Sequence, residues 1–173
     1  LTVAVESKAE RGFRAMEGGG LRAHKAGRVE LPPECTAEEA FRATLQHCLR
    51  HIARNAIAVA QGKLPEGVHQ TRVGLRRLRA ALSSCGDAFR VRGLEGLRER
   101  AKTLADLFGA TRELDVFAAE LLPPVQDAGK RSGLPQLRLL LGELRRSSWE
   151  QTVALAQSDE FTGFLLDLGA AVE

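Results

Sequence analysis

The stretch "EGVHQTRVGLRRLRAAL", residues 66–82, combines an apolar stripe with a row of basic side chains on one predicted helix. On a helical wheel of about 100° per residue, the apolar stripe consists of Leu75, Leu78 and Leu82. A basic stripe lies beside it and consists of His69, Arg72, Arg76 and Arg79. Arg77 points away from both stripes and is expected to be an ordinary solvent-facing charge. The stretch therefore predicts a helix that packs against a core and carries a cationic border.

The arginines of the basic stripe have no acidic neighbour on their own helix. No carboxylate stands three or four positions from Arg72, Arg76 or Arg79, and like charges at this spacing repel by a few tenths of a kcal/mol per pair. A bound polyanion would relieve that repulsion along the whole stripe. Long basic side chains beside an apolar stripe are also common on ordinary solvated helices, so the pattern alone leaves both interpretations open.

The rest of the chain reads as further amphipathic helices. A capping box at Thr36 and Glu39 starts a helix near 37–61. Apolar spacing predicts further helices at 66–89, 94–108, 111–122, 135–157 and 159–172, with Gly109 capping the third. The fold class is therefore all-α: an antiparallel four-helix bundle followed by two helices that need either a partner bundle or docking onto the first.

Residues 1–35 differ from the helical part that follows, and we assign them to a separate piece of the chain. Val3 and Val5 alternate as in a short strand, and the stretch up to Cys35 is punctuated by Gly and Pro.

Composition excludes several classes of protein. Hydrophobic residues make up 44% and charged residues 27% of the 173, which favours a globular domain. No apolar run approaches the roughly 18 residues that span a bilayer, and no signal peptide is recognisable, so we expect a cytoplasmic protein without membrane contact. The three cysteines fit neither a disulfide framework nor a zinc site. Arginine strongly outnumbers lysine, which suits phosphate recognition but also follows from a GC-rich genome.

The basic stripe carries a family resemblance. The stretch "VHQTRVGLRRLRAAL" and the later "LADLFGATRELDVF" closely resemble the CHAD domain, the conserved histidine α-helical domain. Its helices carry an H-x-x-R-V-x-x-R-R-x-R pattern and an L-G-x-x-R-D-x-D-V pattern. The second pattern departs at Phe108 and Glu113, and Glu113 keeps the charge of the usual aspartate.

This resemblance implies two pseudo-symmetric helical bundles whose central basic surface binds inorganic polyphosphate. It covers residues 36–173, with 135–172 resembling the opening helices of the second bundle. The expected polyphosphate-binding residues are His69, Arg72, Arg76, Arg79, Arg98, Lys102 and Arg112, with Arg42 as a peripheral candidate. It also implies a cytoplasmic location associated with polyphosphate granules.

A second, shorter resemblance concerns the N-terminal piece. The stretch "VESKAERGFRAM" resembles the end of a CYTH domain, the triphosphate tunnel fold that often precedes a CHAD domain in inorganic triphosphatases. The ExExK motif of those enzymes is absent, with Ala4 where its first glutamate would stand. We therefore expect this chain to have no catalytic activity and no cofactor, and an adjoining CYTH domain is its expected partner. The alternative is an accessory or structural helical domain of a metal-dependent triphosphatase.

Other candidate sites give weaker signals. His47 and His51 lie four residues apart but are expected opposite the apolar face, where neighbouring arginines would repel a metal ion, so we predict no metal site. His69 is expected to hydrogen-bond phosphate, and a structural bond to a neighbouring helix is the alternative. Asp115 is expected to orient a basic side chain, with an ion pair to Arg112 within the same helix as the alternative. Additional cations that would extend the surface are Arg138, Arg145 and Arg146.

Nucleic-acid binding is the remaining alternative for the basic surface. An aromatic content of 5%, with no tyrosine and a single tryptophan, leaves few platforms on which bases could stack. We therefore favour polyphosphate over nucleic acid.

Overall fold

The computed structural model describes residues 21–85, 88–89, 94, 96–123 and 133–173. Within these ranges the chain forms helices α2 (Ala37–Gly62), α3 (Pro65–Cys85), α4 (Leu97–Val116), α6 (Leu134–Ala156) and α7 (Asp159–Val172), and a short π-helix η1 (Phe117–Leu121). No strand is found in the described ranges, and the all-α class is confirmed. The strand predicted at Val3 and Val5 lies outside the described residues.

The first helix begins where the sequence predicts. The Thr36 hydroxyl accepts a hydrogen bond from the backbone N–H of Glu39, and the Glu39 carboxylate accepts one from the Thr36 N–H at 2.7 Å. These two bonds satisfy donors that a helix start leaves unpaired. The predicted capping box is therefore confirmed.

The prediction of separate helices over 94–108 and 111–122 is wrong, because α4 continues through Gly109 to Val116. The buried positions Ala101, Leu104, Phe108 and Thr111 repeat at intervals of three and four, so the packing face does not change at the glycine. Beyond Val116 the helix widens into η1, where the backbone N–H of Leu122 bonds to the carbonyl of Phe117. The regular apolar spacing was a better guide to helix length than the glycine.

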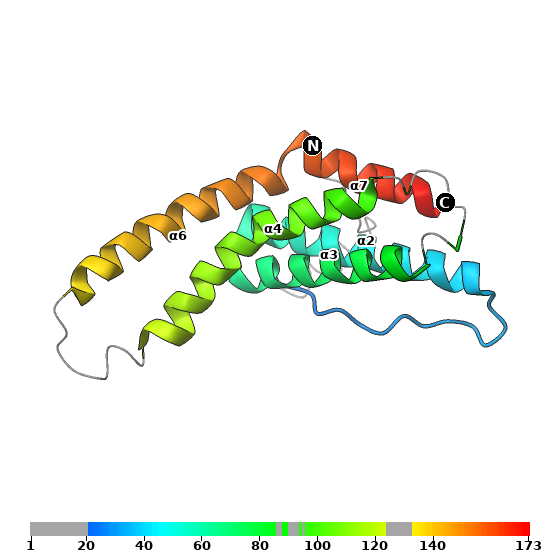
Figure 1. Ribbon diagram of the computed structural model, residues 1–173, viewed down its shortest axis with the longest axis horizontal. Helices are drawn as coiled ribbons and strands as arrows, with labels where there is room; N and C mark the ends of the chain where they lie inside the picture. Colours follow the sequence, from blue (N-terminus) through cyan, green and yellow to red (C-terminus); the bar gives the residue numbers. More distant parts are fainter. Residues whose placement is uncertain (1–20, 86–87, 90–93, 95, 124–132) are drawn as a thin grey trace.

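The last two helices dock onto the first three. In Figure 1, α2, α3 and α4 run alternately in opposite directions, and α7 lies beside α2 while α6 lies along α4. The core is continuous across this arrangement: Phe108 of α4 and Phe161 of α7 are buried with ring centroids 5.7 Å apart. Helix α7 therefore completes the core. The sequence had predicted that residues 111–122 would be the helix in this position.

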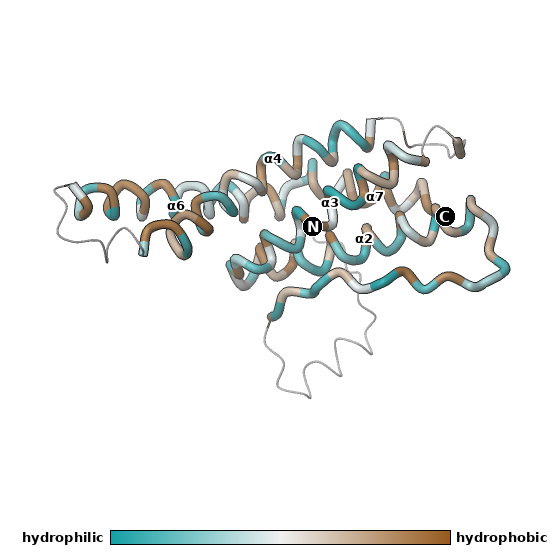
Figure 2. Tube along the Cα trace, turned by 60° about the horizontal axis from the view of Figure 1, so that its bottom comes forward, coloured by the Kyte–Doolittle hydropathy of each residue, from teal (hydrophilic) through white to brown (hydrophobic). Residues whose placement is uncertain are grey.

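The outer part of α6 projects beyond this core together with the end of α4 (Figure 1). Its leucines are exposed, with Leu139 at 71% and Leu140 at 54% of their surface, and Figure 2 shows this part of α6 as largely hydrophobic.

Residues 21–30, here called the anchored segment, run in extended form along α2 and α3 (Figure 1). The backbone N–H of His24 donates to the Asn55 side chain at 2.9 Å, and the Asn55 amide donates back to the His24 carbonyl at 3.0 Å. Because Asn55 is fully buried, these bonds satisfy groups that would otherwise be costly to bury. The segment is therefore fixed to the helices by a buried side chain.

His51 makes the second attachment. Its Nε2 lies 2.9 Å from the His24 carbonyl and 3.2 Å from the Gln70 side-chain oxygen. The Gln70 amide nitrogen donates to Glu66, so both neighbours of Nε2 are acceptors and Nε2 carries the proton. His51 is only 6% exposed, which corrects the expectation that it faces solvent opposite the apolar stripe. The anchored segment and α3 cover it.

Acid should weaken the fold through His51. Burial lowers the pKa of His51 below its ordinary value, although its bonds to His24 and Gln70 oppose the shift. The folded protein then binds fewer protons than the unfolded chain, so stability falls as the pH drops below about 6.5. We expect the thermal midpoint to decrease between pH 7 and pH 5, and to decrease less in His51→Gln. A pH dependence unaltered by that substitution would contradict the role of His51.

Candidate anion-binding surface

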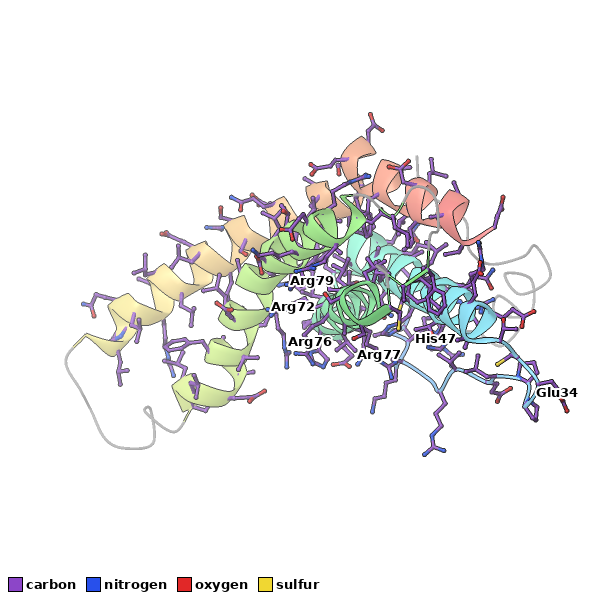
Figure 3. All side chains as sticks on the ribbon, turned by 45° about the vertical axis from the view of Figure 1, so that its right-hand side comes forward. Glu34, His47, Arg72, Arg76, Arg77 and Arg79 are labelled. Atoms are coloured by element: carbon purple, nitrogen blue, oxygen red, sulfur yellow. The ribbon has the colours of Figure 1, made fainter. Side chains whose placement is uncertain are left out.

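The arginines of α3 spread around its exposed side. Figure 3 shows Arg79 and Arg72 on the side toward α4, Arg76 next to them, and Arg77 on the side toward His47 of α2. Arg76 is exposed, while Arg72 and Arg79 are half-buried. In the described part of the chain, none of the arginines of the basic stripe has an acidic partner within 4.0 Å. Their charges are therefore not neutralised by neighbouring helices.

Arg72 occupies a gap that Gly109 leaves on α4. A Cβ placed on Gly109 would stand 2.8 Å from the Arg72 Nη1 and 3.3 Å from its Cζ. Both distances are shorter than ordinary van der Waals contacts, so only glycine leaves room for the guanidinium in this position. The glycine that the sequence suggested as a helix cap instead lets a cation lie against α4.

The contact between Arg72 and Gly109 sets the register of α3 against α4. The two helices run antiparallel. Arg79 stands seven residues after Arg72 on α3 and Lys102 stands seven residues before Gly109 on α4, so these two cations lie at the same level along the helices. In the same way, His69, three residues before Arg72, lies level with Arg112, three residues after Gly109. On α4, Lys102 and Arg112 lie within about 60° of Gly109 around the helix axis. The candidate cations of the two helices thus line one seam.

We call this surface the basic α3–α4 face. It consists of His69, Arg72, Arg76, Arg79, Arg98, Lys102 and Arg112. Two of its members have a distant acidic neighbour: Arg98 lies 3.9 Å from Glu99 and Arg112 lies 4.0 Å from Glu120. Exposed pairs at such distances contribute little. Apart from Arg98 and Arg112, no member of the face has a carboxylate within 4.0 Å in the described part of the chain, while Asp106 and Glu113 stand on the same side of α4 as Lys102.

The positions of Arg42 and His69 bear on two further expectations. Arg42 stands on α2 rather than on α3 or α4, and its guanidinium pairs with Glu38 at 3.1 Å, so it does not belong to this face. His69 is half-buried, and no hydrogen bond to it is found among the described residues. The structural bond that was the alternative role for His69 is thus not seen in that part of the chain.

Replacing Gly109 with alanine should separate binding from folding. The added methyl group must displace the Arg72 guanidinium, which is the flexible end of a side chain, while alanine favours a helix interior by about 1 kcal/mol over glycine. We expect unchanged or slightly higher thermal stability, together with a roughly 3- to 10-fold weaker affinity for an anion on this face, since one charge-assisted contact is perturbed. Calorimetric titration and thermal unfolding measure the two effects. An affinity equal to that of the original chain would show that Arg72 takes no part.

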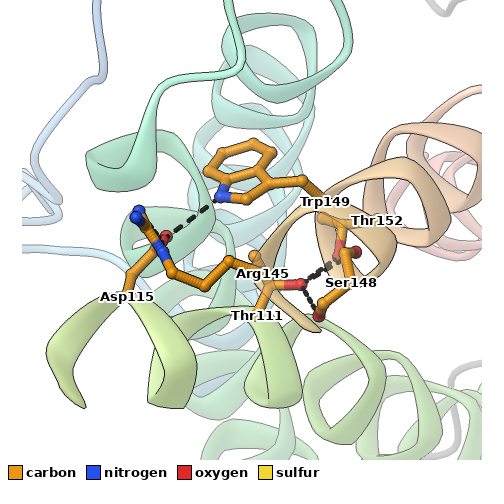
Figure 4. A network of polar contacts seen from close by, with 6 residues as sticks. All are labelled: Thr111, Asp115, Arg145, Ser148, Trp149 and Thr152. Carbon is orange, nitrogen blue, oxygen red and sulfur yellow. Dashed lines mark hydrogen bonds and ion pairs between the residues drawn. The ribbon is translucent and has the colours of Figure 1, made fainter. Parts of the chain in front are cut away.

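Asp115 joins α4 to α6 rather than to its own helix (Figure 4). Its Oδ1 accepts hydrogen bonds from the Arg145 guanidinium at 2.6 and 3.0 Å and from the Trp149 indole at 3.2 Å. Asp115 is 4% exposed. The prediction that it orients a basic side chain is confirmed, but that side chain is Arg145 and not Arg112. Arg145 is correspondingly unavailable as an extension of the basic surface.

A hydroxyl cluster continues the same interface. Thr111 Oγ1 lies within hydrogen-bond distance of Ser148 Oγ and of Thr152 Oγ1, the latter at 2.7 Å (Figure 4). Thr111 and Thr152 are both buried. This cluster could not be predicted from the sequence, because threonines at helical spacing are indistinguishable from surface polar residues until their partner helix is known.

Comparisons with known proteins agree with this architecture. The crystal structure of the CHAD domain from the plant Ricinus communis superposes with a TM-score of 0.77 at 33% sequence identity, over 88% of this chain and 51% of that one. This chain thus spans about half the length of that solved structure. A comparison with curated proteins finds no match.

The fold is that of an all-helical domain of the CHAD type. The sequence model of the CHAD domain matches residues 43–173, and this chain belongs to the CHAD family. Domains of this family are generally non-catalytic. No helix in the described residues is both long and apolar enough to cross a bilayer.

Proposed function

We propose that this chain binds inorganic polyphosphate along the basic α3–α4 face. The observation that carries the proposal is the row of Arg72, Arg76 and Arg79, which has no acidic partner within 4.0 Å in the described part of the chain. Guanidinium groups form paired hydrogen bonds with phosphate oxygens. A linear chain of phosphates supplies such oxygens at every repeat, and so matches a row of cations better than a single anion does.

The α4 side of the face supports a linear ligand. Lys102 and Arg112 lie on the same side of one continuous helix as Gly109, opposite the arginines of α3. A chain lying in the seam would contact cations from both helices. These contacts would offset the mutual repulsion that the free protein carries.

Titration with long-chain polyphosphate at several salt concentrations tests this function. By analogy with single-stranded nucleic acids, contacts from six cations give a slope of about −4 in log K against log salt. We expect binding at low salt with a slope of that size, measured by isothermal titration calorimetry. Absence of binding at low salt, or binding insensitive to salt, would refute the proposal. Competition by single-stranded RNA at equal affinity would favour nucleic acid instead.

We further propose that the chain acts as the binding portion of a CYTH–CHAD protein and does not itself hydrolyse phosphate. In the described residues no group of three or more His, Cys, Asp or Glu side chains converges as a metal site would require. We expect no phosphate release when the chain is incubated with triphosphate and magnesium. Release above a no-protein control would contradict this assignment and favour the triphosphatase alternative.

A further inference from the structure

A second group of cations lies on the edge of the bundle where α2 and α3 meet the anchored segment. The Arg77 guanidinium donates to the Gly27 carbonyl at 3.4 Å. A Cβ at the same glycine would stand 3.8 Å from the His47 Cε1. Arg77 and His47 thus flank one point of the backbone, and Figure 3 shows them on the same edge of the molecule.

The charges of this group act on one another. Burial, together with the positive charges of Arg77 and Arg50, lowers the pKa of His47. Arg50 and Arg77 are both exposed, and in the described ranges neither has a carboxylate within 4.0 Å. Like charges gathered without an acid are unfavourable unless an anion joins them. The electrostatics of this edge therefore favour an oxyanion.

One polar atom in the group lacks a partner. The Nε2 of His47 is buried and makes no hydrogen bond to any of the described residues, and a buried ring nitrogen without a partner is costly. In its protonated form the imidazole would be a donor at this position. A phosphate oxygen would satisfy this nitrogen once the side chains that cover it move, with the Arg77 guanidinium turning from the Gly27 carbonyl to the same anion.

We propose that His47, Arg50 and Arg77 form a second site for a phosphate group, beside the anchored segment and separate from the basic α3–α4 face. Arg77 supplies a guanidinium fork, Arg50 a second cation, and His47 a ring N–H. Lys25 and Arg28 of the anchored segment are exposed and add positive charge to its surroundings. This inference extends the proposed function to a second surface and does not require the first surface to bind.

The two surfaces lie on opposite sides of α3. Figure 3 shows Arg76 between Arg72 and Arg77, so cations continue from one surface to the other around the exposed side of the helix. The phosphate could accordingly come from a long chain that continues past α3 or from a short free anion such as pyrophosphate. The long chain and pyrophosphate present the same tetrahedral phosphate group, and probes of different chain length distinguish between them.

Binding at the second site should take up a proton. His47 has a lowered pKa in the free protein and is mostly neutral at pH 7, whereas a bound phosphate favours its protonated form. Affinity should consequently rise as the pH falls from 7.5 to 6. The groups that act on the ring are Arg50 and His51 of α2 and Arg77 of α3, and Lys25 and Arg28 stand within two residues of Gly27 in the anchored segment. Only the histidines among them titrate in this range.

Proton NMR of the His47 ring in the full chain tests the second site, with pyrophosphate and long-chain polyphosphate as separate probes. His47→Gln identifies the His47 resonance. We expect saturating pyrophosphate to shift that resonance and to raise its titration midpoint. We also expect Arg77→Gln to weaken pyrophosphate binding about 10-fold, and Lys63→Gln, which removes an equal charge from an exposed position at the end of α2, to leave it unchanged.

The outcomes separate this inference from the proposed function. If neither pyrophosphate nor long-chain polyphosphate moves the His47 resonance, or if Arg77→Gln and Lys63→Gln weaken pyrophosphate binding equally, the second site does not exist. If pyrophosphate moves the resonance but long-chain polyphosphate does not bind to the α3–α4 face, the second site stands and the proposed function fails. A response of His47 to polyphosphate but not to pyrophosphate would assign the site to long chains alone.

Discussion

Replacing Arg72, Arg76 and Arg79 together with glutamine should reduce the affinity for long-chain polyphosphate by about 1000-fold or more. Hydrogen bonds to charged groups contribute about 1.5 kcal/mol or more each, and the remaining cations of α4 keep part of the binding. The slope of log K against log salt should become shallower by about 2 units, because three fewer counterions are displaced. Calorimetric titration at three salt concentrations measures both quantities. Glutamine keeps the length of the side chains, so the packing of α3 should survive.

A charge-matched variant controls for the loss of three positive charges. Arg22, Lys25 and Lys63 are exposed and stand on neither α3 nor α4, and their replacement with glutamine lowers the net charge by the same amount. This variant should lose no more than a few-fold in affinity through long-range electrostatics. Equal losses in the two variants would mean that polyphosphate responds only to net charge and that the basic α3–α4 face is not a site.

Removing the Arg145 side chain should have the largest effect on stability. Arg145→Met leaves the buried Asp115 carboxylate without its cation and with only the Trp149 indole as donor. Breaking a buried ion pair from one side costs about 3–5 kcal/mol, and the partial exposure of Arg145 places the expected loss near 3 kcal/mol. For a chain of this length the thermal midpoint should fall by about 6–12 °C. Circular dichroism follows the transition, and the single tryptophan reports on this contact directly.

A second substitution in the same ion pair shows whether the unpaired Asp115 carboxylate causes the loss of stability. Asp115→Asn combined with Arg145→Met removes both charges and keeps an amide oxygen near the indole. We expect the double variant to recover at least half of the lost stability, a coupling that a double-mutant cycle quantifies. A double variant as unstable as the sum of the single variants would show that Arg145 stabilises α6 through packing alone.

The sequence predicted most of the helical part of this fold. Thr36 and Glu39 placed the start of α2, and the bounds of α6 and α7 lie within a residue of those expected. These predictions succeeded because caps and apolar periodicity are local properties of the chain. The prediction at Gly109 failed because the reason for that glycine is the guanidinium of Arg72 on another helix.

The candidate sites were partly predictable for the same reason. The basic stripe of α3 follows from helical spacing, so its arginines could be named in advance. The burial of His51 depends on an extended segment with no periodicity of its own, and the role of Asp115 depends on a residue thirty positions later. The assignment of residues 1–35 to a CYTH-like tail stays a prediction.

Because α4 is continuous, the distance between the cations at its two ends is fixed. Arg98 and Arg112 stand fourteen residues apart on one rigid helix, which is about 21 Å at 1.5 Å per residue. Had the helix been interrupted at Gly109, this separation would vary with the hinge. Anions shorter than this span can reach only some of the cations, so affinity should climb with the number of phosphates until the two ends are bridged and then level off.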